Sequence, residues 1–341
     1  GNPNVTTETT TAVASLLRQI IFRCYYRDFR LLKRRITFRG IEKTISRLEK
    51  LLYQNAFNTQ PHPKDLQSEL LSLLNSVKQT LITDHDSLFV DIVDGLIQKV
   101  RLFGCFFATV DIRQDSRVLR NVFKYCTQQS QIKAGVSTIS APLHETEKLK
   151  AISFNEADFH CTEDADDMTK DTLNTIRLVQ QIQQSNGEKA CQRFIISNCQ
   201  RSSDILQLVD LFLWSGWKKE SLSIDFIPLF EMVNDLKKAA QIMESLYVNP
   251  FYKEHLKRRG NRQTIMLGFS DSTKDGGYLM ANWSIYKAKV ELTAMARKHG
   301  IHLAFFDGRG GPPARGGGKT HRFYVSMGSE IANEHIQLTI Q

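Results

Sequence analysis

The sequence predicts an α/β protein in which a helical amino-terminal region precedes a series of parallel βα units. Three observations lead to this prediction: apolar residues recur every three to four positions in the first hundred residues, five short apolar runs follow, and helical patterns come after three of those runs. The composition, 41% hydrophobic and 24% charged, is ordinary for a globular protein, and no apolar run approaches the length of a membrane span. A chain of 341 residues can form one large domain or two ordinary ones.

The first hundred residues predict four helices. Their apolar spacing places them at 9–38, 41–55, 64–83 and 87–103. Pro61 and Pro63 separate the second helix from the third, and the cluster Asp84-His85-Asp86 separates the third from the fourth. We therefore expect residues 1–103 to form a helical region.

Residues 104–341 show a different rhythm. Short runs rich in β-branched and aromatic residues predict strands at 105–114, 193–198, 222–231, 264–272 and 301–309. Helices are expected at 203–214, 234–248 and 278–299, the last with Leu279, Trp283, Tyr286 and Val290 on one stripe and Gly300 as its C-cap. Strands that alternate with amphipathic helices favour parallel βα units across 104–341.

Polar residues gather at the expected carboxyl ends of the strands. They are Asp111 with Arg113, Ser197 with Asn198, Glu231, Ser270 with Asp271, and Asp307 with Arg309. In a βα barrel these ends form one face, and in an open doubly wound sheet they line one crevice. With either topology we expect the motifs to converge on one place.

Two carboxylates among these residues suit a hard cation. Glu231 and Asp271 form a candidate Mg²⁺ or Mn²⁺ site, because such ions take one or two carboxylates and leave positions for substrate oxygens and water. Lys274 is a candidate for proton transfer or charge neutralisation, with a surface salt bridge as the alternative. Arg113 is a candidate anion-binding residue, and a structural ion pair with Asp111 or Asp115 competes with that role.

Six glycines fall within residues 308–318, together with Arg309 and Arg315. Gly310 and Gly311 leave the backbone open, so amides and the two guanidinium groups can reach a phosphate or carboxylate. The run GGGKTH at 316–321 is not a P-loop, because Pro313 stands where that motif needs glycine. RNA-binding RGG repeats are the weaker reading, since those lie in long low-complexity tracts.

Charge and cysteines give weaker signals. The net charge is +9, and residues 1–50 hold eleven Lys and Arg against four Asp and Glu, which allows a nucleic-acid contact or a charged outer helix face. Six cysteines without a CxxC pair favour reduced thiols over disulfides or zinc. The acidic segment 155–171 lacks the central glycine of a calcium loop, so we expect a solvated loop or the lead-in to a helix.

Four motifs together closely resemble those of the phosphoenolpyruvate carboxylase family, the biotin-independent lyases. They are VDIRQDS (110–116), PLFE (228–231), IMLGFSDSTKDGG (265–277) and GRGGPPARGGGKTH (308–321). The opening GNPNVT looks like the end of the DRDGNP motif of that family. The resemblance is strong across 101–341 and generic before it.

The resemblance implies a mostly helical protein built round a TIM-like α/β barrel, active as a cytoplasmic, allosterically regulated homotetramer that feeds the tricarboxylic acid cycle. Phosphoenolpyruvate and bicarbonate would become oxaloacetate and phosphate through carboxyphosphate and an enolate, without biotin. Glu231 and Asp271 would hold Mg²⁺ or Mn²⁺, Lys274 would be catalytic, and Arg113 and Arg309 would act on the phosphate. Arg315 would lie in the glycine loop, near a site for an inhibitory dicarboxylate such as aspartate. No membrane or specific nucleic-acid partner is implied.

The sequence departs from that family at several positions. Phe269 stands where the family usually has Tyr, and Asp307 where it usually has His, so an acid–base role at 307 is in doubt. The TAHPT motif with its catalytic His is absent, as is the carboxyl-terminal part. We therefore expect a central fragment with an incomplete barrel, inactive by itself. The competing hypothesis is a basic, non-enzymatic scaffold or nucleic-acid-binding module that reuses the fold.

Overall fold

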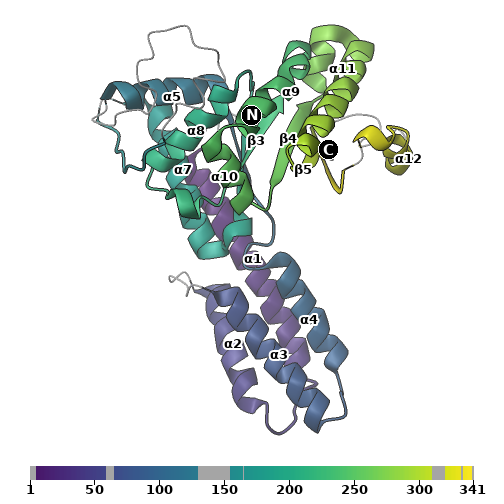
Figure 1. Cartoon of the computed structure of the whole chain (residues 1–341). Helices are drawn as coiled ribbons and strands as arrows, with labels where there is room; N and C mark the ends of the chain where they lie inside the picture. Colours follow the sequence, from purple (N-terminus) through teal and green to yellow (C-terminus); the bar gives the residue numbers. More distant parts are fainter. Residues whose placement is uncertain are drawn as a thin grey trace. The chain divides into compact units, whose positions relative to one another are not determined.

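The computed structural model describes residues 5–58, 65–129, 154–163, 165–308, 319–331 and 333–339 (Figure 1). The chain packs into two compact units, one of Asp111–Arg177 with Arg193–Gln341 and one of Asn2–Val110 with Leu178–Gln192. The sequence-based division at 103/104 lies seven residues before the first of these boundaries and does not assign 178–192 to the helical part. In the described part of the chain, no helix is both long and apolar enough to cross a membrane.

Four helices form the helical unit, and each contacts two neighbours (Figure 1). They are α1 (Thr7–Lys33), α2 (Glu42–Phe57), α3 (Leu66–Asp84) and α4 (Val90–Phe103). Their apolar faces make one buried core that includes Phe22, Phe29, Leu48, Leu74 and Val93. The four helices expected from the sequence are confirmed, with ends that differ by a few residues.

Several basic side chains of the first fifty residues form hydrogen bonds or ion pairs within this unit. Arg18 is buried and donates to Asn55 Oδ1 at 3.0 Å and to the carbonyl of Ser185. Lys33 pairs with Glu49 at 2.6 Å. These contacts favour the alternative of a charged helix face over a nucleic-acid contact.

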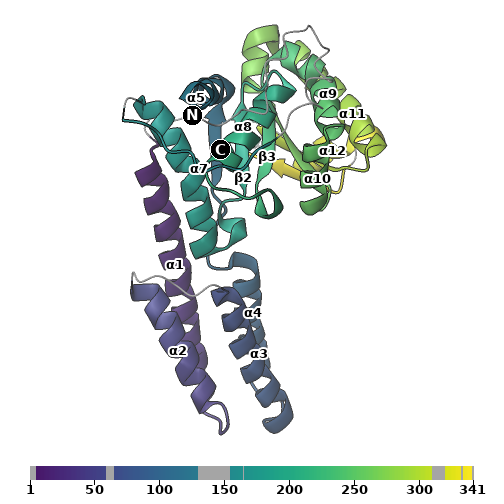
Figure 2. The same ribbon diagram turned by 60° about the vertical axis from the view of Figure 1, so that its left-hand side comes forward.

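The other unit holds a six-stranded parallel sheet in the order β1-β2-β3-β4-β5-β6 (Figure 2). Its strands are β1 (Asp111–Asp115), β2 (Arg193–Ser197), β3 (Asp225–Phe230), β4 (Arg262–Gly268), β5 (His302–Gly308) and β6 (His335–Leu338). The α-helices that follow α4 are α5 (Ser116–Gln129), α7 (Asp167–Asn186), α8 (Ser202–Trp214), α9 (Val233–Tyr247), α10 (Pro250–Arg258), α11 (Ser270–Lys298) and α12 (Thr320–Val325). Short 3-10 helices lie at Glu188–Ala190, Lys219–Ser221 and Ser329–Ile331. The expectation of an α/β fold with parallel βα units is confirmed.

One face of the sheet carries an apolar cluster from four strands. Ile195, Ile227, Leu229, Met266 and Phe306 are its buried members. On the same face of β2, Arg193 donates to Gln337 Oε1 in β6 at 2.7 Å, although three strands lie between β2 and β6. Flat strands spaced about 4.8 Å apart would keep these two side chains out of reach, so the sheet is curved with the apolar cluster on its concave side.

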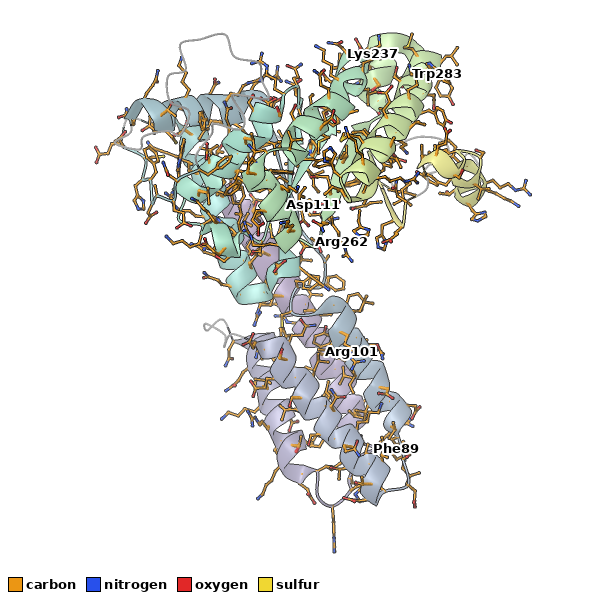
Figure 3. The ribbon with its side chains drawn as sticks, viewed as in Figure 1. Phe89, Arg101, Asp111, Lys237, Arg262 and Trp283 are labelled. Atoms are coloured by element: carbon orange, nitrogen blue, oxygen red, sulfur yellow. The ribbon has the colours of Figure 1, made fainter. Side chains whose placement is uncertain are left out.

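The helix α11 differs from the expected one in two ways. It begins at Ser270 and bends at Gly277, whose φ of 79° and ψ of 169° are outside the helical region. The first half of the expected stripe faces outward, since Leu279 is 82% exposed and Trp283 57% exposed (Figure 3), whereas Tyr286 and Val290 are partly buried. The buried face of α11 includes small residues such as Ala281 and Ala288 and, nearer its end, larger ones such as Leu292 and Met295.

Candidate active site

The centre of the candidate site is the carboxylate of Glu231, which directly follows β3. Arg113 from β1 donates through Nη2 to Glu231 Oε1 at 2.7 Å. The backbone N–H of Asn198, which follows β2, donates to Glu231 Oε2 at 2.8 Å. Groups from β1 and from the carboxyl ends of β2 and β3 therefore meet at one carboxylate. Asn198 and Glu231 follow their strands as predicted, whereas Arg113 lies in the middle of β1 and not at its end.

The backbone of Asn198 is shaped for this contact. Its φ is 53°, a left-handed conformation that asparagine adopts more readily than most residues. The hydroxyl of Ser116, fully buried at the start of α5, donates to the Asn198 carbonyl at 2.7 Å. The sequence marks Asn198 as a polar strand end but gives no sign that its amide, not its side chain, reaches the site.

Asp111 does not belong to this site. It is the first residue of β1, not near its carboxyl end, and Figure 3 shows it at the same end of the sheet as Arg262, the first residue of β4. Asp111 accepts from Arg193 Nε at 2.7 Å, and burial raises the pKa of this carboxyl while Arg193 opposes that rise. The prediction that Asp111 lies at the carboxyl end was wrong, because the strand starts six residues later than the apolar run 105–114.

The ion pairs around β1 show which carboxylate is the partner of Arg113. Asp111 pairs with Arg193, and Asp115 pairs with Arg117 at 2.8 Å. Arg113 instead pairs with Glu231 across the sheet, so neither of the two sequence neighbours is its partner in the described structure. Its side chain is 40% exposed, which leaves the guanidinium open to an anion.

Asp271 and Lys274 lie on the first turns of α11, at the carboxyl end of β4. Lys274 Nζ is 3.1 Å from Asp271 Oδ1, and the side chains are 78% and 48% exposed. This is the surface pair that the sequence analysis gave as the alternative for Lys274. Both charged groups are accessible, and a catalytic role for Lys274 stays a prediction.

The donor set suits a divalent oxygen-seeking cation. Glu231 and Asp271 follow neighbouring strands, and each carboxylate oxygen of Glu231 keeps a lone pair beyond its one described hydrogen bond. Among the described residues there is no group of three or more His, Cys, Asp and Glu that could hold a metal. Two carboxylates with water and substrate oxygens completing the shell is the arrangement that Mg²⁺ usually takes.

Asp307 lies on the opposite face of β5 from Phe306 of the concave cluster. Its carboxylate is 4% exposed, accepts from Lys289 Nζ at 2.8 Å, and accepts from the Tyr324 hydroxyl at 2.6 Å. Lys289 Nζ also lies 5.3 Å from the Phe305 ring centroid. The side chain thus faces the helices and not the site, and the expectation that position 307 joins the converging polar residues was wrong.

A cavity of about 420 Å³ lies beside Lys289, away from this site. Phe305, Tyr324, Met327 and Ile336 are among its lining residues. None of the candidate site residues that the structure describes lines it, so its position gives no reason to place the substrate there.

A family model of phosphoenolpyruvate carboxylase matches residues 37–341 of the chain. The chain belongs to the phosphoenolpyruvate carboxylase family. The match covers every strand of the sheet and all four motifs, including the residues that meet at Glu231. Members of this family are carboxy-lyases that act on phosphoenolpyruvate, which agrees with a site that combines carboxylates with a partly exposed guanidinium.

Several residues expected in a phosphoenolpyruvate carboxylase site cannot be placed. Arg309, Gly310, Gly311 and Arg315 lie outside the described residues, although the family match includes them. The structure describes their flanks, Gly308 at the end of β5 and Lys319 before α12. Their roles toward the substrate stay predictions.

Proposed function

We propose that this chain carries the metal and substrate-phosphate site of a phosphoenolpyruvate carboxylase that converts phosphoenolpyruvate and bicarbonate to oxaloacetate and phosphate. The observation that carries the proposal is the Glu231 carboxylate at the carboxyl end of β3, held between Arg113 of β1 and the Asn198 amide that follows β2. We further propose that the curved, sequentially ordered sheet is part of a TIM-like barrel, in which such ends form the active-site face.

Glu231 and Asp271 would hold Mg²⁺ or Mn²⁺ next to the substrate. When bound, the ion supplies Lewis-acid charge beside the oxygen atoms of phosphoenolpyruvate. Arg113 and the Asn198 amide fix the Glu231 carboxylate before any ligand arrives, so little reorganisation is needed on binding.

Arg113 would bind the phosphate of phosphoenolpyruvate. Its bond to Glu231 uses one of several N–H donors of the guanidinium, so the group can hold the carboxylate and an anion at once. Arg309 would add a second cation to the same phosphate, and Arg315 would serve the glycine loop.

Lys274 would neutralise charge or move a proton at the reacting atoms. Its ammonium lies within reach of Asp271, so a substrate bound at the metal would lie near it. Catalysis as a homotetramer in the cytoplasm, with inhibition by a dicarboxylate such as aspartate, belongs to the same proposal and rests on the family alone.

The test is oxaloacetate formation by the full gene product from phosphoenolpyruvate and Mg²⁺, with and without bicarbonate. We expect bicarbonate-dependent oxaloacetate that Lys274→Ala loses. Lys298→Ala is the matched control, because Lys298 is another exposed lysine of α11 in a surface ion pair, with Glu244 at 2.8 Å. Phosphate release without oxaloacetate would show a site that cleaves the substrate but does not carboxylate it. No turnover at all would contradict the proposal.

The nucleic-acid alternative has no described feature in its favour. Its support in the sequence was the net charge of +9 and the RGG pairs at 309–311 and 315–317. The RGG pairs lie outside the described residues, and Arg18 and Lys33 of the basic amino-terminal region have partners within the helical unit. We therefore do not propose it.

A further inference from the structure

Two side chains at the start of α11 bond the backbone that carries Glu231. The hydroxyl of Ser272, which is fully buried, lies 2.7 Å from the Gly268 carbonyl and also within hydrogen-bond distance of the Glu231 carbonyl. Asp275 Oδ2 accepts from the backbone N–H of Val233 at 3.0 Å. The end of β3 is thus tied to α11 on both sides of Met232.

These bonding residues alternate with the candidate site residues along α11. Ser272 follows Asp271 directly, and Asp275 follows Lys274 directly. On the β3 side of this contact, one of the bonded residues is Glu231 itself, through its backbone carbonyl. Any shift of α11 relative to the end of β3 would therefore change the separation of the Glu231 and Asp271 carboxylates.

The closeness of the two backbones shows that this contact is tight. A Cβ atom added to Gly268 would lie 3.1 Å from Glu231 Cγ and 3.2 Å from Glu231 Cα, closer than nine in ten real contacts of a Cβ atom. A larger residue at 268 would therefore require Glu231 to shift by a few tenths of an ångström. The Ser272 hydroxyl, with one proton for two carbonyl oxygens, connects the two strand ends at the point of closest approach.

We propose that Ser272 and Asp275 are positioning residues that fix Glu231 relative to Asp271 and thereby set the affinity for the divalent ion. This inference rests on the proposed function, because it takes these two carboxylates as the metal ligands. Mg²⁺ demands near-ideal octahedral geometry, so a small change in carboxylate spacing weakens binding. Residues that orient metal ligands typically change affinity by roughly 10–100-fold when removed.

The experiment measures Mn²⁺ binding to the full gene product directly, from the electron paramagnetic resonance signal of free Mn²⁺. We expect Ser272→Ala and Asp275→Ala each to weaken Mn²⁺ binding by about 10-fold. Asp275→Asn keeps an acceptor oxygen for the Val233 amide and should bind Mn²⁺ within about 3-fold of wild type, since the hydrogen bond and not the charge does the positioning.

Thr273→Val is the matched control for removing a hydroxyl. Thr273 Oγ1 donates at 2.8 Å to the Phe269 carbonyl one turn back in its own helix, so it does not bridge to β3. This variant should bind Mn²⁺ like wild type. In assays, Ser272→Ala should raise the metal concentration for half-activation more than it raises KM for phosphoenolpyruvate at saturating metal.

The outcomes distinguish a failure of this inference from a failure of the proposed function. Wild type that binds Mn²⁺ while Ser272→Ala and Asp275→Ala bind it equally well would overturn the inference alone. Wild type that binds no Mn²⁺ would overturn the proposed metal site and the inference with it. Asp275 is exposed, so its Ala and Asn variants keep the test decisive even where the buried Ser272→Ala does not fold.

Discussion

At the scale of single residues, the buried ion pair of Asp307 leads to a prediction about stability. Asp307 pairs with Lys289 at 2.8 Å, and the two side chains are only 6% and 2% exposed. Removing one partner of a buried ion pair leaves the other charge without compensation, which costs about 3–5 kcal/mol. We therefore expect Asp307→Asn to lower the free energy of unfolding by about that amount, measured by urea denaturation.

The control for Asp307→Asn is a surface ion pair that, like the buried one, includes a lysine of α11. Glu244 accepts from Lys298 at 2.8 Å, with side chains 45% and 67% exposed. Exposed pairs contribute at most about 1 kcal/mol, so Glu244→Gln should change stability little. Equal effects of the two substitutions would contradict the assignment of Asp307 as a structural residue.

Because His255 is buried, we predict that the stability of the protein depends on pH. Burial lowers the pKa of His255 from 6.5 to about 4, and its Nε2 lies 2.9 Å from the Ile224 carbonyl. Because the folded pKa is below the unfolded one, the unfolded chain binds the extra proton first. The contribution of His255 to stability is therefore present above about pH 6.5 and is lost as the pH falls toward 4, by up to about 3 kcal/mol.

The measurement is urea unfolding between pH 4 and 7 of wild type and His255→Gln. Glutamine can still donate to the Ile224 carbonyl but does not titrate. The difference in unfolding free energy between the two proteins should shrink, or change sign, as the pH falls from 6.5 to 4. A difference that stays constant with pH would show that His255 does not remain neutral in the folded protein.

Residue types predicted part of the site, and backbone geometry decided the rest. Arg113, Glu231, Asp271 and Lys274 could be chosen because charged groups stood out after apolar runs. The role of Asn198 could not, since any residue has an amide. Asp307 was misassigned because alternation along a strand sends neighbours to opposite faces, and the sequence does not say which face is concave.

At the scale of elements, the bend in α11 gives a clean test of backbone conformation. Gly277 has φ 79° and Gly95 lies within α4, and a Cβ at either would meet nothing within 4 Å. Gly277→Ala should therefore destabilise by about 1–3 kcal/mol through its conformation alone. Gly95→Ala should be neutral or stabilising by about 0.5–1 kcal/mol.

Thermal or urea unfolding of the two glycine variants checks this prediction. Equal changes in the unfolding free energy for Gly277→Ala and Gly95→Ala would contradict it, because the two glycines differ in backbone conformation and not in the space around them. The bend comes directly after the residues 270–276, so Gly277→Ala should also reduce activity by moving Asp271 and Lys274.

Helices with a regular spacing of apolar residues were predicted well, whereas strands in segments of mixed apolar and polar residues were not. The run 105–114 begins apolar and ends polar, yet only its end joins β1, because Cys105 is buried in the core of the helical unit and Phe107 has φ 63°. The strand β6 was missed, since four residues of alternating polarity give too little signal. Composition alone does not show whether an apolar residue packs in the helical unit or in the unit that holds the sheet.

At the scale of the whole molecule, the order of the strands carries information that no single motif holds. Sequential order with parallel pairing means that each connection steps to the adjacent strand, as in a βα barrel and unlike a doubly wound sheet. The Arg193–Gln337 bond then shows curvature on the side of the apolar cluster. Local periodicity could not decide between these topologies, because both contain the same βα units.

The last prediction concerns the 341-residue chain expressed alone. The described site offers Arg113, Glu231, Asp271 and Lys274, but the family motif with the catalytic His is absent from this sequence. Without that catalytic group, we expect no bicarbonate-dependent oxaloacetate, while cooperative unfolding and Mn²⁺ binding remain. Assays beside the full gene product, both from a host without its own phosphoenolpyruvate carboxylase, check this. Oxaloacetate formation by the chain alone, lost in Lys274→Ala, would mean that the residues within this sequence suffice for catalysis.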